Sequence, residues 1–172
     1  IVPALTRIGD QWENGTVALS QVYMSARILE EVLEAWFQPV RDRRAGPRIG
    51  IGVLEDYHAL GKRIVHAILT SAGRDVVDLG TGLSVGAMVE GAAKADIQVL
   101  MISVLMFNKA LHVSQVVEKL EARGLGHIKV VVGGAPFMMD PDLWRRVGAD
   151  AYGRSAADAL RLSAAREEGA TP

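Results

Sequence analysis

An aspartate and a histidine two residues apart form the pair of side chains in this chain best suited to hold a ligand. Asp56 and His58 follow the apolar run 49–54, which is typical of a buried parallel strand. Open α/β sheets bind ligands at the carboxyl ends of their strands, and this pair stands at such an end. An imidazole nitrogen can bind a metal ion while a carboxylate accepts a hydrogen bond from the other ring nitrogen. The pair predicts a metal ligand, with a capping or core histidine as the alternative.

Other strand ends carry small or hydroxyl residues. Ser103 ends one apolar run with Leu105 two positions later, and Gly133 with Gly134 follows another. Glycine lets a large flat ligand approach the backbone closely. Each residue also has a structural alternative, because a serine can simply end a strand and glycines can simply turn the chain. The Gly-Thr-Gly at 80–82, expected as a turn, lacks the dinucleotide fingerprint, and no glycine turn carries a Walker A lysine, so binding of a nucleotide phosphate is disfavoured.

Strands and helices alternate in the part of the chain that positions these residues. Short β-branched runs between amphipathic segments predict βαβ units with right-handed crossovers. We therefore expect an α/β fold with a Rossmann-like (flavodoxin-like), doubly wound parallel five-stranded sheet, preceded by a small helical cap. The expected strands are 49–53, 75–79, 99–103, 129–132 and 149–152, and the expected helices are 60–71, 85–95, 110–123 and 141–147.

The first forty residues differ from the rest. Apolar side chains at helical spacing predict a helix over 17–36, and a shorter helix is expected over 3–12. Residues 41–48 are charged, contain Gly and Pro and show no periodicity, which favours a solvated linker over a binding patch. We expect a partial helix bundle over 1–40, the linker over 41–48 and the ligand-binding α/β domain over 49–172.

The composition excludes several function classes. The chain of 172 residues can bury a sizeable core, and its 19 basic and 20 acidic side chains leave a net charge of −1, which favours neither a nucleic-acid nor a membrane surface. The absence of cysteine removes disulfides, thiolate zinc sites, iron–sulfur clusters and a cysteine nucleophile. No segment has the roughly 18 apolar residues of a membrane span, and no signal peptide is recognisable. We expect a cytoplasmic protein, and the start at Ile1 fits a fragment of a longer chain.

The remaining histidines offer no alternative site. His66, His112 and His127 are not spaced as a metal cluster and are expected to be surface or structural residues. The chain also has no Ser-His-Asp arrangement with identifiable roles and no carboxylate pair suited to general acid–base catalysis. The protein is therefore expected to hold a reactive group, not to supply the reactive side chains itself.

The order D-x-H-x-x-G, S-x-L and G-G across a βαβ pattern resembles the cobalamin-binding domain of methionine synthases, base-off mutases and corrinoid methyl-carrier proteins. The resemblance runs from about 48 to 160 and includes the longer D-x-H-x-x-G-K-x-I-V pattern at 56–65. It implies that His58 is the lower axial ligand of cobalt in place of dimethylbenzimidazole, that Asp56 holds the other ring nitrogen of His58, and that Gly61 lets the corrin lie close. The other cofactor-binding residues that it implies are Tyr57, Ala59 and Leu60 in the same motif, and Ser103, Leu105, Gly133 and Gly134 around the nucleotide tail.

The helical start resembles part of the cap of the methyl-carrier proteins, in which an apolar helix shields the upper face of the corrin. Val22 and Tyr23 stand where light-sensing relatives carry Glu-His, which counts against a photoreceptor. The resemblance implies that these two residues shield the cofactor, although they could also be plain buried contacts.

As a whole, the resemblance implies a corrinoid carrier subunit of a methyltransferase system. It would bind cobalamin, as methylcobalamin or another corrinoid, in the base-off/His-on form. It would shuttle a methyl group between donor and acceptor methyltransferase proteins through Co(I) and methyl-Co(III), with no catalysis expected on its own. A reductive activase is a further possible partner.

Two alternatives stay open. One is a cobalamin-dependent sensor or regulatory protein, in which the cofactor changes protein or DNA contacts without methyl transfer. The missing Glu-His and the lack of a basic patch disfavour it, and a DNA-binding domain upstream of Ile1 would favour it. The other is a flavodoxin-like module for a different ligand.

Overall fold

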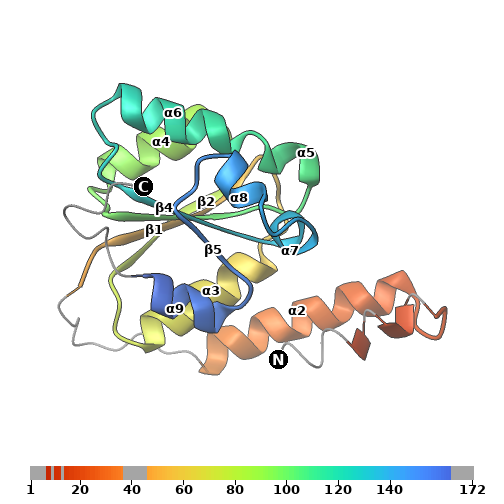
Figure 1. Cartoon of the computed structure of the whole chain (residues 1–172). Helices are drawn as coiled ribbons and strands as arrows, with labels where there is room; N and C mark the ends of the chain where they lie inside the picture. The colour runs from red at the N-terminus through yellow and green to blue at the C-terminus, as the bar shows by residue number, and fades with distance from the viewer. Residues whose placement is uncertain (1–6, 9, 13, 37–45, 164–172) are drawn as a thin grey trace. The chain divides into compact units, whose positions relative to one another are not determined.

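The α/β part of the chain is built on one parallel sheet. The structure, a computed structural model, describes residues 7–8, 10–12, 14–36 and 46–163. The described residues form a 5-stranded sheet in the order β2-β1-β3-β4-β5, with every pairing parallel (Figure 1). This is the flavodoxin-like order, in which the direction of winding reverses between β1 and β3. The strands are β1 Ile49–Leu54, β2 Val76–Leu83, β3 Val99–Ser103, β4 Lys129–Gly133 and β5 Ala151–Gly153. The predicted fold class is confirmed.

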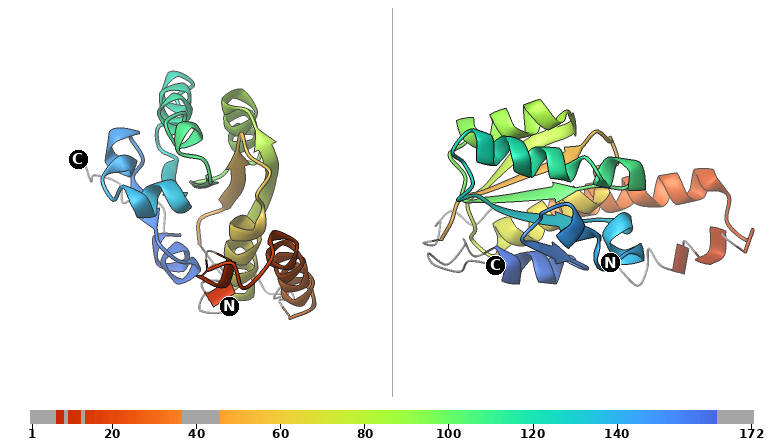
Figure 2. Two further views of the ribbon diagram at one scale, coloured as in Figure 1. Left: turned by 90° about the vertical axis from the view of Figure 1, so that its right-hand side faces the viewer. Right: turned by 45° about the horizontal axis from the view of Figure 1, so that its top comes forward.

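Helices cover both faces of this sheet. α3 and α9 lie against one face and α4 and α6 against the other, as Figures 1 and 2 show. Two of these helices begin at a serine that caps them, because Ser84 accepts a hydrogen bond from the backbone N–H of Ala87 and Ser155 accepts one from that of Asp158, each at 3.2 Å. The helices are α3 Leu60–Ser71, α4 Val85–Lys94, α5 Phe107–Ala110, α6 Val113–Ala122, α7 Ala135–Met139, α8 Leu143–Arg146 and α9 Ala156–Leu162.

The core has two layers because side chains alternate across each strand. In β3, Leu100 and Ile102 join the larger cluster, to which α4, α6 and α8 contribute, whereas Val99 and Met101 join the cluster beneath α3 and α9. β1 is buried along its whole length. Burying one large aliphatic side chain contributes about 1.5–3 kcal/mol, so the central strands form a firm base for the loops at their carboxyl ends.

Several expected boundaries are wrong. The helix expected over 110–123 is divided into α5 and α6, α7 precedes the helix expected over 141–147, and α9 was not predicted. These are short helices of 4 to 10 residues, which show little periodicity. Residues 80–82 are not a turn but part of β2, because Gly80 and Gly82 adopt positive φ angles of 110° and 65° and the pairing with β1 shifts register there.

The chain divides into two compact units, residues 1–36 and 37–172, which we describe separately. In the first unit, α2 Leu19–Trp36 corresponds to the helix expected over 17–36, and residues 7–8 and 10–12 are helical where a helix over 3–12 was expected. The rest of that shorter helix and residues 41–45 of the expected linker lie outside the described residues. No helix in the described part of the chain is long and apolar enough to cross a membrane.

Candidate functional site

The segment that carries Asp56 and His58 lies at the point where the strand order reverses. It leaves the carboxyl end of β1 and leads into α3. β3 pairs with β1 on the side away from β2, and Val53 of β1 lies opposite Ser103 of β3. Doubly wound sheets hold their ligands outside the strand ends at this switch point. The predicted residues of the first two motifs, D-x-H-x-x-G and S-x-L, are therefore brought to one place.

The Asp56 carboxylate fixes the orientation of the His58 ring. Asp56 Oδ1 lies 2.5 Å from His58 Nδ1 and also accepts the backbone N–H groups of Tyr57 at 2.6 Å and His58 at 3.0 Å. An ionised carboxylate only accepts hydrogen bonds, so Nδ1 is the donor, and in the neutral ring the lone pair lies on Nε2. The Asp56 side chain is 5% exposed and that of His58 is 70% exposed. The imidazole therefore extends into solvent from a buried anchor, with Nε2 available as a metal ligand.

The alternative roles of a histidine at this position do not fit. A core histidine would be buried, which His58 is not. The N-terminal cap of α3 is Ala59, and no side chain makes a capping hydrogen bond there.

The surroundings of Asp56 favour its ionised form. Burial raises the pKa of its carboxyl. Hydrogen bonds from the His58 side chain and from the His58 and Tyr57 backbone lower the pKa by more than burial raises it, so the pKa lies below its ordinary value of 3.8. The second carboxylate oxygen, Oδ2, is buried and has no hydrogen-bond partner among the described residues. A buried acceptor of this kind normally has a partner, so Asp56 Oδ2 departs from the usual pattern.

Small residues line the carboxyl edge next to this pair. Ser103 lies opposite Gly133, and Gly133 lies opposite Gly153, in neighbouring strands. Side chains alternate across a strand, so Ser103 and its neighbours in the row lie on the same face of the sheet as Met101, which packs toward α3 and α9. A Cβ on Gly61 would have only Ser103 Oγ nearby, at 3.8 Å, and one on Gly133 would lie 3.5 Å from the Gly153 carbonyl oxygen. This row, Gly61, Ser103, Gly133 and Gly153, leaves room that larger side chains would fill.

The other predicted residues of the α/β unit have different surroundings. Gly134 has a φ of 117°, and a Cβ there would lie 1.8 Å from the Val104 carbonyl oxygen, so the close approach of two backbones requires this glycine. Leu105 is 42% exposed at the same edge. Tyr57 is 80% exposed, and Leu60 begins α3 directly after Ala59.

The predicted cap residues belong to the first unit. Val22 and Tyr23 both lie in α2, and Val22 is half-buried. The Tyr23 side chain lies outside what the structure describes. Their shielding role stays a prediction.

Two ion-pair clusters beside the site were not predicted as functional. Glu55 Oε2 is 3.0 Å from Lys109 Nζ and 2.8 Å from His112 Nδ1, although both partners are distant in sequence. Lys62 Nζ is 2.6 and 2.8 Å from the two carboxylate oxygens of Asp78. Only the second cluster left a signal in the sequence, because Lys62 occupies a position of α3 that shares a face with the buried Leu69. Gly153 was also missed, since it follows a very short strand.

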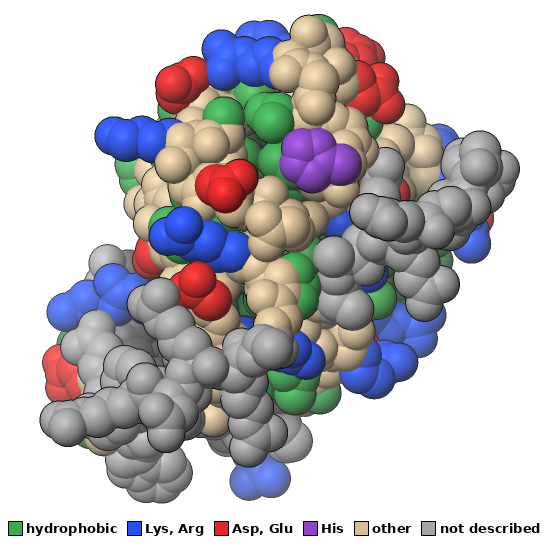
Figure 3. Space-filling view, turned by 90° about the vertical axis from the view of Figure 1, so that its left-hand side faces the viewer, with side chains coloured by type: hydrophobic (Ala, Val, Ile, Leu, Met, Phe, Trp, Pro, Cys, Tyr) green, Lys and Arg blue, Asp and Glu red, His purple; other side chains and the backbone are tan. Residues whose placement is uncertain are grey.

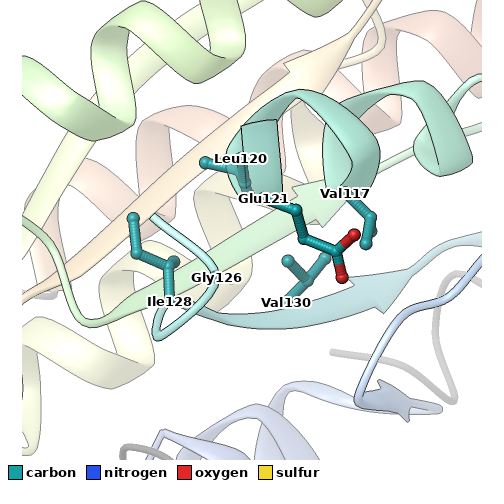
Figure 4. A pocket seen from close by; sticks show the side chains of 6 residues that line it. All are labelled: Val117, Leu120, Glu121, Gly126, Ile128 and Val130. Atoms are coloured by element: carbon teal, nitrogen blue, oxygen red, sulfur yellow. The ribbon is translucent and has the colours of Figure 1, made fainter. Parts of the chain in front are cut away.

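A separate recess lies at the opposite edge of the sheet from these residues. It has an empty volume of about 190 Å³, part of which is open solvent, and lies between α6 and the beginning of β4 (Figure 4). Its lining is Val117, Leu120, Glu121, Gly126, Ile128 and Val130. Val130 is the second residue of β4, so the recess opens near the amino end of that strand, opposite to the edge that carries His58. We assign it no function.

Surface charge gives no sign of a nucleic-acid site on the face in Figure 3. Basic and acidic side chains are interspersed among its described residues, in keeping with the net charge of −1. A binding surface for nucleic acid would show basic residues clustered on one face.

The carboxylates of this edge predict a fall in stability in acid. The pKa of Glu55 is lowered from 4.5 by hydrogen bonds from Lys109 and His112, and the pKa values of Asp56 and Asp78 lie below 3.8. A group with a lowered pKa stabilises the folded state above its unfolded pKa, and this contribution is lost as the pH falls through the folded value. The free energy of unfolding, measured with urea, should therefore fall below pH 4.5, after an earlier decline below pH 6.5 from the half-buried His66, whose pKa burial lowers.

Two variants test this assignment. Glu55→Gln should make the decline below pH 4.5 shallower, whereas Glu118→Gln, which removes an exposed carboxylate of α6, should change it little because solvent screens such a charge. Equal slopes in Glu55→Gln and the parent protein would contradict the assignment.

Comparisons with known proteins identify the family of the chain. A family model described as B12 binding domain matches residues 48–161, and a second with the same description matches residues 1–36. The chain is 34% identical to trimethylamine corrinoid protein 1 of Methanosarcina mazei over 163 residues, which cover 91% of this chain and 74% of that protein. It is 32% identical to dimethylamine corrinoid protein 3 of Methanosarcina acetivorans over 161 residues, covering 91% and 74%.

Solved structures give the same result. The monomethylamine corrinoid protein of Methanosarcina barkeri superposes with a TM-score of 0.71 at 27% identity, covering 92% of this chain and 76% of that one. The methanol:cobalamin methyltransferase complex MtaBC of the same organism gives a TM-score of 0.63 at 25% identity, covering 92% and 61%. The predicted resemblance is confirmed: the chain belongs to the B12 binding domain family, and its cofactor is a cobalamin or related corrinoid.

Proposed function

We propose that this protein is a corrinoid methyl carrier that holds cobalamin base-off, with His58 as the lower axial ligand, and shuttles a methyl group between donor and acceptor methyltransferase proteins. The observation that carries the proposal is the exposed His58 ring, whose Nδ1 is fixed 2.5 Å from the buried Asp56 carboxylate. The similarity to methylamine corrinoid proteins supports methyl carriage over other uses of cobalamin.

The described residues fit the cofactor. The small side chains of the row Gly61, Ser103, Gly133 and Gly153 would leave space for the nucleotide tail, and Leu105 offers an exposed apolar side chain at the same edge. When bound, the cobalt would supply the methyl-transfer chemistry through its change of oxidation state. The protein contributes axial ligation, orientation and access.

Asp56 and His58 would also take part in proton uptake. Metal binding requires a neutral imidazole nitrogen, so Nε2 must be unprotonated whenever it is a ligand. Release of Nε2 from the metal would open that atom of the exposed ring to protonation by an acid in solution. The buried Asp56 carboxylate 2.5 Å from Nδ1 would then stabilise the cationic ring. The pair thus couples a change in axial ligation to proton uptake.

The first unit would serve as the cap of the cofactor. α2, with Val22 and Tyr23, would shield the upper face of the corrin, and residues 1–40 would form the cap domain ahead of the linker. A shield and a methyl donor compete for the same face, so the cap has to move during each transfer. Donor and acceptor methyltransferases, with a reductive activase, are the proposed partners, and a complex named for methanol:cobalamin methyltransferase is among the similar structures.

A methyl-transfer assay tests the carrier role. The protein is loaded with hydroxocobalamin, reduced, and mixed with a methyltransferase encoded beside its gene and with methylamines or methanol as donors. We expect methylation of the bound cofactor only when both proteins are present. A loaded protein that no such methyltransferase methylates, but whose DNA or protein binding depends on the cofactor, would instead establish the sensor alternative.

A further inference from the structure

A buried lysine lies one residue beyond the D-x-H-x-x-G segment. The Lys62 side chain is 5% exposed, and its Nζ lies 2.6 and 2.8 Å from the two carboxylate oxygens of Asp78. Lys62 is in the first turn of α3, where a positive charge is opposed by the helix dipole as well as by desolvation. The ion pair with Asp78 of β2 offsets these costs.

Asp78 also holds the bulged end of β2. Its Oδ1 accepts the backbone N–H of Gly80 at 2.8 Å, and Gly80 and Gly82 both adopt positive φ angles. The pKa of Asp78 is raised by burial but lowered more by the hydrogen bonds from Lys62 and Gly80, so it lies below 3.8 and the carboxylate is ionised at neutral pH. One carboxylate therefore joins α3 to the bulge.

The bulge in turn holds the backbone of Asp56. The N–H of Gly82 donates to the Asp56 carbonyl oxygen at 2.7 Å, and the Leu83 carbonyl oxygen accepts the N–H of Glu55 at 2.9 Å. The Tyr57 ring lies against Gly82, where a Cβ would come within 2.5 Å of Tyr57 Cε1. The residue that orients His58 is thus fixed from the side of β2.

We propose that Lys62 and Asp78 are positioning residues, which set the backbone of 56–61 so that His58 can meet the cobalt. The inference rests on the proposed axial role of His58. The hydrogen bonds of Lys62 and Asp78 in the described part of the chain go to each other and to Gly80, not to the His58 ring. The two residues would act through Gly80, Gly82 and the first turn of α3. Residues that orient a metal ligand indirectly typically change metal affinity about 10–100-fold when they are replaced.

The two partners should differ in importance. Asp78→Asn keeps an acceptor for the Gly80 N–H but leaves the cation of the buried Lys62 unpaired. Lys62→Met leaves a carboxylate whose side chain is 46% exposed and which water can solvate. Removing one partner costs most when the charge left behind is buried, so Asp78→Asn should weaken ligation more than Lys62→Met.

Electron paramagnetic resonance of the Co(II) form provides the test. Each variant is loaded with cobalamin, reduced by one electron, and examined for the splitting that an axial nitrogen produces. The dissociation constant of hydroxocobalamin and the midpoint of thermal unfolding of the cofactor-free protein are measured alongside. Leu120→Ala is the control, because this residue is buried in α6 on the other face of the sheet and its loss lowers stability alone.

We expect Asp78→Asn to lose most of the nitrogen splitting and to bind hydroxocobalamin about 10-fold more weakly, with a smaller change in Lys62→Met. Leu120→Ala should unfold at a lower temperature yet keep the full splitting. Full splitting in both ion-pair variants would overturn this inference alone. The inference would also be overturned if Leu120→Ala lost splitting in proportion to its loss of stability. Absence of splitting in the parent protein would overturn both this inference and the axial role of His58.

Discussion

Replacing His58 with alanine is expected to abolish axial nitrogen ligation while leaving the fold intact. The side chain is 70% exposed, and its ring contact is the one to Asp56, so little packing is lost. Without it, Nε2 is no longer offered to the cobalt. The Co(II) form should lose its axial nitrogen splitting, and the absorption spectrum should change from that of His-on to that of His-off cobalamin.

Two further variants sharpen this prediction. Asp56→Asn retains an acceptor for Nδ1 but removes the buried negative charge, so the nitrogen splitting should persist while cobalamin binds about 10–100-fold more weakly. His127→Ala removes an exposed histidine in the loop before β4 and should leave both spectra and affinity unchanged. Nitrogen splitting that survives in His58→Ala would show that another group is the ligand, and the proposed function would then lose its central residue.

The order of the main strands and helices could be predicted because it depends on local patterns. The helix over 60–71 was predicted with its observed bounds, since its apolar residues repeat at helical spacing. The His58 environment was also largely predictable, because Asp56 is two residues away and a strand end fixes where the pair must lie.

The rest depends on contacts that a single sequence does not encode locally. Lys62 pairs with Asp78, which is 16 residues away in sequence. Glu55 pairs with Lys109 and His112, which are 54 and 57 residues away. Which side chains pair follows from the strand order and from the positive φ angles of Gly80 and Gly82, which let β2 continue past a glycine pair that is typical of a turn. Sequence reasoning therefore finds the proposed ligand, His58, more readily than the residues proposed to position it.

Gly134→Ala is expected to destabilise the whole α/β unit. The backbone φ is 117°, and the added Cβ would lie 1.8 Å from the carbonyl oxygen of Val104 and 2.9 Å from its carbonyl carbon. Both atoms belong to backbone beside β3, so no side-chain rotation relieves the clash. Overpacking and an unfavourable φ together should cost about 3 kcal/mol or more, which lowers the midpoint of thermal unfolding by about 6–12 °C in a domain of this size.

The neighbouring glycine separates packing from cofactor binding. Gly133 is not in the positive φ region, and an added Cβ would make an ordinary contact of 3.5 Å with the Gly153 carbonyl oxygen. Gly133→Ala should therefore fold with nearly the parent stability but bind hydroxocobalamin more weakly, because the methyl group fills part of the row beside Ser103. Calorimetry of the cofactor-free proteins and cobalamin titration distinguish the two. If Gly134→Ala folded normally and lost only cofactor binding, Gly134 would line the tail site as the sequence pattern implies, and its contact with Val104 would not be the reason for the glycine.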